Sequence, residues 1–124
     1  MSAVRAVTES QSGSAILRKF ALTSVVQLPE FTDGGFFVIF GKVTLANHDG
    51  DPQDAHVQLR LGGEGGVVLD ETFVRIAGSG DANRQCASVQ SELKEVPTGG
   101  TVDIACGTFD GVALQAKLTV LEAL

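Results

Sequence analysis

The sequence predicts an all-β fold, a jelly-roll β-sandwich of about 8–10 antiparallel strands. Of its 124 residues 15 are Gly, and Phe supplies all 7 aromatic residues. Val, Ile, Leu, Phe and Thr dominate the regularly patterned segments, as is typical of strands. Gly, Asp, Asn and Pro separate these segments at spacings of about 10 residues. No long stretch has the 3.6-residue hydrophobic period of a helix.

The chain should contain one folded domain. Residues 1–14 are small and polar, so we expect a flexible N-terminal tail. Residues 15–124 are expected to form a single domain, which is long enough to bury a core without crosslinks. Residues 15–28 predict one or two short strands, ended by Pro29.

The long strand that follows the turn at Asp33–Gly35 is the most informative segment. Side chains alternate between the two faces of a strand. One face carries only apolar residues, which are Phe37, Ile39, Val43 and Leu45. The other face begins with Phe36, Val38 and Phe40 and becomes polar only at Lys42 and Thr44. A half-solvated strand should be polar at every second position, so either a second copy or residues 15–28 of the same chain should cover this face.

The middle of the chain predicts two strands joined by a flexible tip. The cluster Asn47–Pro52 indicates a turn. Residues 55–61 alternate cleanly between apolar and polar side chains, and the glycine-rich segment Gly62–Gly66 closes this strand. The mixed pattern of residues 67–76 predicts a further strand with a bulge near Asp70–Glu71.

Three more strands complete the prediction, over residues 84–93, 101–107 and 112–120. We expect Val102, Ile104 and Cys106 to point inward, and Asp110–Gly111 to form a hairpin turn. The strongly apolar end of the last strand predicts that this strand lies inside a sheet.

The two cysteines, Cys86 and Cys106, leave two alternatives open. A hairpin centred near Val96 would bring them within disulfide distance. The apolar faces match better in a register shifted by one residue, which pairs Ala87 with Cys106. The alternative to a disulfide is two buried, inert thiols, which a cytoplasmic location would favour.

The order of these features resembles the tumour necrosis factor-like jelly-roll family, which includes complement globular-head domains. The resemblance covers roughly residues 15–124. It rests on two motifs in the first half of the chain, the glycine and aromatic residues of Gly35–Phe40 that begin a long strand and the strand and turn of Val57–Gly63. In the second half it rests on the glycine-containing turn that leads into a strand at Val96–Val102 and on the apolar C-terminal strand at Lys117–Leu121. The family usually places Tyr or Trp in these strands, whereas this chain has neither.

This resemblance implies a homotrimer around a threefold axis. Phe36, Val38 and Phe40 would form the oligomer interface, and the module would have a structural, adhesive or partner-binding role. A carbohydrate-binding lectin of the same architecture and a phage or particle accessory protein are the alternatives. A protein or glycan partner is therefore compatible with the sequence, and Arg60, Arg75 or Arg84 could hold sugar hydroxyls.

The sequence predicts neither catalysis nor a cofactor. A nucleophile needs a nearby base, and the only histidines, His48 and His56, are expected on the surface. The loop residues Asp49, Asp51 and Asp54, together with Asn47 and possible contributions from Asp33, Asp81 or Asn83, are weak candidates for binding Ca²⁺. The favoured interpretation is a turn rich in Asx residues, which hydrogen-bond their own backbone and hold no metal.

Charge and hydropathy limit the classes of partner. The formal net charge of −6 argues against nucleic acid and anionic membranes. The sequence contains no run of about 18 apolar residues, so we expect no membrane-spanning helix. The N-terminus lacks the apolar core of a signal peptide. We therefore expect a cytoplasmic or particle-associated protein without membrane insertion.

Overall fold

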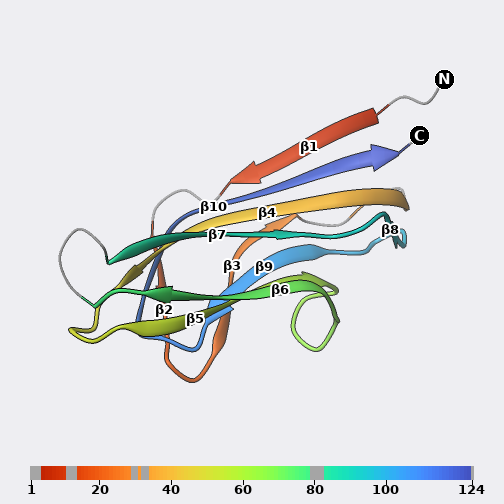
Figure 1. The fold of residues 1–124 in the computed structure, drawn as a ribbon. Coiled ribbons are helices and arrows are strands. Elements are labelled where there is room, and N and C mark those ends of the chain that lie inside the picture. The colour runs from red at the N-terminus through yellow and green to blue at the C-terminus, as the bar shows by residue number, and fades with distance from the viewer. Residues whose placement is uncertain (1–3, 11–13, 29–30, 32–33, 79–82, 124) are drawn as a thin grey trace.

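The computed structural model describes residues 4–10, 14–28, 31, 34–78 and 83–123. They form an antiparallel jelly-roll β-sandwich of two layers (Figure 1). Its strands are β1 (Val4–Ser10), β2 (Ala15–Leu17), β3 (Leu22–Leu28), β4 (Gly35–Asn47), β5 (Gln53–Leu61), β6 (Val67–Ile76), β7 (Arg84–Gln90), β8 (Lys94–Val96), β9 (Val102–Gly107) and β10 (Gly111–Ala123). The predicted fold class is confirmed.

The first layer, sheet A, has the order β1-β10-β4-β7. Strand β2 also pairs with β10, and β8 also pairs with β4. The C-terminal strand β10 therefore lies inside a sheet, as its apolar sequence predicted. Strand β1 runs antiparallel to β10, and Val4 lies opposite Ala123 (Figure 1).

The second layer, sheet B, has the order β3-β9-β5-β6. Its β5–β6 hairpin closes through the glycine-rich tip, where Gly62, Gly63 and Gly65 adopt positive φ angles of 90°, 70° and 79°. Gly tolerates this region because it has no Cβ. The register between β5 and β6 shifts at Leu69, one residue before the predicted bulge.

The core lies between the sheets and contains the residues expected there. Phe37, Ile39, Val43 and Leu45 of β4 are buried, with exposed fractions of 4% or less. The ring of Phe31 packs edge-on against the ring of Phe37, with 4.8 Å between the ring centroids. The inward face of β4 was therefore predicted correctly.

Sequence patterns predicted some pairings wrongly. Residues 4–10 were assigned to a flexible tail but form β1, while the rest of segment 1–14 lies outside the described residues except for Ser14. Asp110–Gly111 does not close a hairpin, because β9 belongs to sheet B and β10 to sheet A. Local turn residues specify a reversal, but they do not specify which sheet the next strand joins.

Candidate functional site

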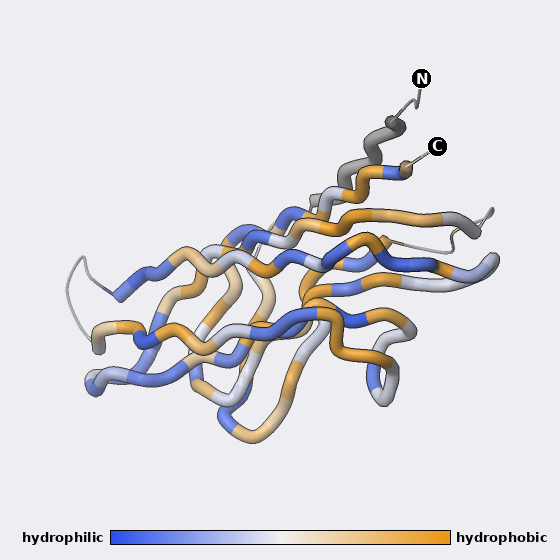
Figure 2. The backbone as a smooth tube through the Cα atoms, turned by 45° about the vertical axis from the view of Figure 1, so that its right-hand side comes forward, coloured by the Kyte–Doolittle hydropathy of each residue, from blue (hydrophilic) through white to orange (hydrophobic). Residues whose placement is uncertain are grey.

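The outer face of sheet A carries the apolar residues that the sequence singled out. Phe36 is 51% exposed, and Val38 and Phe40 are half-buried. On β10, Leu121 lies opposite Val38 in the strand register. Figure 2 shows the hydrophobic run along the first half of β4. We call the surface formed by Phe36, Val38, Phe40 and Leu121 the apolar face.

Residues 15–28 do not cover the apolar face. Strand β2 pairs with the other end of β10, at Gly111–Ala113. Strand β3 pairs with β9 in the opposite sheet. The expectation that residues 15–28 of the same chain cover this face is therefore wrong for the part of the chain that the structure describes. Phe36 remains half exposed because both candidate strands are hydrogen-bonded elsewhere.

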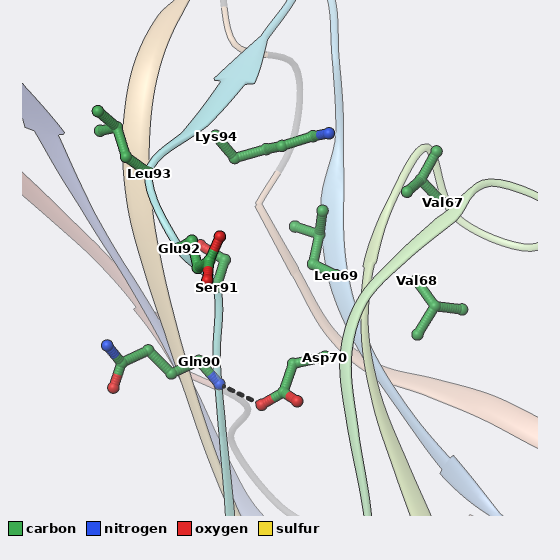
Figure 3. Close-up of a pocket in the computed structure, with 9 residues that line it drawn as sticks. All are labelled: Val67, Val68, Leu69, Asp70, Gln90, Ser91, Glu92, Leu93 and Lys94. Carbon is green, nitrogen blue, oxygen red and sulfur yellow. Dashed lines mark hydrogen bonds between the residues drawn. The ribbon is translucent and has the colours of Figure 1, made fainter.

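A cleft of 520 Å³ lies beside this face, where β6 meets the β7–β8 connection (Figure 3). Val67 and Val68 line one wall and are 53% and 43% exposed. The backbone N–H of Gln90 donates a hydrogen bond of 2.8 Å to Asp70 Oδ2 and bridges the two sheets. Leu93, 57% exposed, points away from β6, whereas Lys94 extends toward it (Figure 3). The cleft thus opens at the sandwich edge, next to an exposed Leu.

The outer face of sheet B contains a buried ion pair that sequence reasoning missed. Arg60 Nε donates to Asp103 Oδ1 at 3.0 Å, and a terminal guanidinium nitrogen donates to Oδ2 at 2.6 Å. The side chains are only 8% and 4% exposed. Hydrogen bonding to Asp103 raises the pKa of Arg60, and burial opposes this change. Arg60 is therefore committed to Asp103 and is unsuited to hold a sugar hydroxyl.

A second group on this face surrounds an exposed aromatic ring. His56 stacks on Phe73 with ring centroids 4.2 Å apart. Glu71 Oε2 lies 3.3 Å from His56 Nε2 and accepts a 3.1 Å hydrogen bond from Gln58. The His56 side chain is only 13% exposed, so the expectation of a solvated histidine is wrong here. Its neighbours are a carboxylate and a phenyl ring, neither of which is a hydroxyl or thiol nucleophile.

The acidic loop is organised by Asn47, which is buried. Its amide donates to the backbone carbonyls of Asp51, Ile76 and Ala77 at 2.9–3.3 Å. Its Oδ1 accepts the N–H of Asp49 at 2.8 Å, as an Asx turn requires.

The metal candidates do not converge in the described residues. Asp54 pairs with Arg75 on the outer face of sheet B, with 3.1 Å between Asp54 Oδ1 and a guanidinium nitrogen. Asp49 remains in the turn, where Oδ1 accepts the N–H of Asp51. No group of three potential ligands forms within residues 4–10, 14–28, 31, 34–78 and 83–123. Asp33 and Asp81 lie outside the described residues.

Both cysteines are free thiols. Cys86 on β7 is exposed and lies opposite Thr44 of sheet A. Cys106 on β9 is buried and lies opposite Val57 of sheet B. The two expected hairpin registers are wrong because β7 and β9 belong to different sheets. Burial raises the pKa of the Cys106 thiol to about 12, with a further contribution from the Asp103 carboxylate.

In the described residues, no helix has the length and apolar character needed to cross a membrane. Arg84 is exposed on β7 and His48 is exposed in the β4–β5 turn. The apolar face is one of several exposed apolar features among the described residues, since Phe20, Ile16 and Phe73 are 92%, 70% and 63% exposed.

Comparison with known proteins identifies a shared fold. No protein-family model matches the sequence, and no curated protein matches it significantly. Among solved structures, the chain is similar to the Eiger tumour necrosis factor protein of S. frugiperda, with a TM-score of 0.61 and 9% sequence identity. The match covers 96% of this chain and 92% of that chain. The resemblance to tumour necrosis factor-like jelly rolls is thus shown at the level of the fold.

Proposed function

We propose that this chain is a non-enzymatic module that assembles into a homotrimer and has a structural, adhesive or partner-binding role. The observation that carries the proposal is the exposed apolar face on sheet A. The threefold number follows from the tumour necrosis factor-like resemblance, whereas the burial argument requires only further copies of the chain.

Covering the exposed part of the Phe36 ring in an assembly would contribute a substantial free energy of association. A Phe side chain buries roughly 150–250 Å², so a half-exposed ring leaves about 100 Å² to be covered. At about 25 cal/mol per Å², covering it stabilises an assembly by about 2.5 kcal/mol. Val38, Phe40 and Leu121 add smaller amounts, since they are already partly buried. Continuous apolar surface of this kind is typical of interaction sites.

The interface should end at Lys42. This residue is exposed on the same face of β4, two positions beyond Phe40. Burying an unpaired ammonium group is costly, so a contact that covers Phe36, Val38 and Phe40 should leave Lys42 near solvent or close to an anion.

Light scattering of the purified chain tests the proposal. We expect a mass of three times the chain mass of 12.9 kDa. Phe36→Asp and Phe40→Asp should dissociate the assembly because each places a carboxylate in the contact. Phe20→Asp is the matched control, because Phe20 is 92% exposed in the β2–β3 turn. A wild-type monomer, or equal dissociation by the Phe20 variant, would contradict the proposal.

A further inference from the structure

A hollow on the outer face of sheet A is lined by two lysines from adjacent strands. Lys42 of β4 lies directly opposite Lys117 of β10, and both side chains are exposed. The hollow measures 520 Å³ and is also lined by Phe40, Ser88 and Thr119. Ser88 of β7 lies opposite Lys42 on its other side. Lys117, Lys42 and Ser88 therefore form one row across three strands.

Within residues 14–28, 31, 34–78 and 83–123, no ion pair joins either ammonium group to a carboxylate. The ion pairs there join His56 to Glu71, Arg60 to Asp103 and Arg75 to Asp54. Like charges directly opposite on neighbouring strands destabilise a sheet. Acidic side chains are abundant in this chain, which has 15 of them and a net charge of −6. An unpaired lysine pair in such a chain indicates a place for an external anion.

The Asp70 carboxylate also lines the hollow. Its Oδ2 accepts the backbone N–H of Gln90 at 2.8 Å, and its Oδ1 accepts the backbone N–H of Glu71 at 2.9 Å. These two hydrogen bonds hold the carboxylate, which keeps its negative charge, at the edge of the sandwich. No ion pair joins Asp70 to either lysine within the described part of the chain.

We propose that this hollow binds an oxyanion, the chemical group shared by phosphate, sulfate and carboxylate. Lys42 and Lys117 supply adjacent charged donors, and the Ser88 hydroxyl adds a neutral donor in the same row. Charge-assisted hydrogen bonds of this type are the strongest that such donors make. The Phe40 ring forms an apolar wall, which strengthens the attraction by excluding water from one side.

The oxyanion has two possible sources, a free anion or a carboxylate of a second copy at the apolar face. The site itself does not depend on the proposed trimer, because the two lysines and Ser88 belong to one chain. A monomeric protein that binds phosphate would refute the trimer and retain the oxyanion site.

Titration of the full chain with inorganic phosphate and sulfate in low-chloride buffer tests the site. We expect both anions to raise the melting temperature, because binding only the folded state stabilises it. Lys42→Gln or Lys117→Gln should weaken binding measured by calorimetry by about tenfold. Lys19→Gln, in the exposed β2–β3 turn, removes the same charge and should leave binding unchanged. Without anion, the Lys42 variant should melt no lower than wild type, because charge repulsion is removed.

The mass in solution distinguishes the two sources. A phosphate response at constant mass identifies a free anion as the ligand. A mass that falls in Lys42→Gln, without any phosphate response in wild type, identifies a carboxylate of a second copy. The oxyanion site would be overturned if wild type shows no phosphate response and Lys42→Gln does not lower the mass. Equal loss of phosphate binding in Lys19→Gln would also overturn it.

Discussion

Breaking the buried Arg60–Asp103 pair should destabilise the fold far more than breaking an exposed pair of the same type. Asp103→Ala leaves the Arg60 guanidinium on the outer face of sheet B without the carboxylate that accepts its two hydrogen bonds. The side chains are 8% and 4% exposed, so water replaces the lost partner poorly. Removing one member of a buried pair typically costs about 3–5 kcal/mol.

The chain contains its own matched control for this prediction. Arg75 and Asp54 form the same Arg–Asp pair between β6 and β5, but their side chains are 67% and 64% exposed. Exposed pairs contribute about 0–1 kcal/mol. Asp54→Ala should therefore leave stability almost unchanged, whereas Asp103→Ala should remove a large part of the roughly 5–15 kcal/mol that is typical of a domain.

Urea unfolding of the purified variants measures both effects on one scale. The Asp103→Ala curve should shift to lower urea at an unchanged slope, because the surface exposed on unfolding is nearly the same. Replacing both members by apolar residues, as in Arg60→Leu with Asp103→Leu, should recover much of the loss, since no charge remains buried. A midpoint for Asp103→Ala equal to that of Asp54→Ala would refute this account of the pair.

Three further predictions concern the cysteines and the core. In the native protein a thiol reagent should modify only Cys86, which is exposed, and should reach Cys106 only after unfolding. Because the pKa of Cys106 rises from 9.0 to about 12 on folding, the unfolded chain loses this proton first. Stability should therefore fall between about pH 9 and 12, with a slope of about 1.4 kcal/mol per pH unit that Cys106→Ala removes. Gly41→Ala should cost about 1–3 kcal/mol in thermal or urea unfolding, because a Cβ there would lie 2.8 Å from Ile104 and Val89 side-chain atoms. An unshifted Gly41→Ala transition, or rapid native modification of Cys106, would contradict these expectations.

The elements of the fold were largely predictable, whereas their partners were not. Alternation along β4 identified Phe37 and Ile39 as core, because side-chain direction follows from the strand itself. Pairing depends on residues far apart in sequence, so the hairpin expected for Cys86 and Cys106 was wrong. The Arg60–Asp103 pair escaped prediction for the same reason. Arg60 occupies a polar position of β5, and only the register with β9 places Asp103 opposite it.

By itself, the sequence determined the all-β class, the inward faces of the strands and the anomaly of Phe36, Val38 and Phe40, since these depend on local periodicity. Only the tertiary structure decided that residues 15–28 leave this face open, because β2 and β3 form their hydrogen bonds with β10 and β9. It also brought Lys42 and Lys117 together across two strands. Long-range register, which no local pattern encodes, therefore defined both surfaces on which the proposed functions rest.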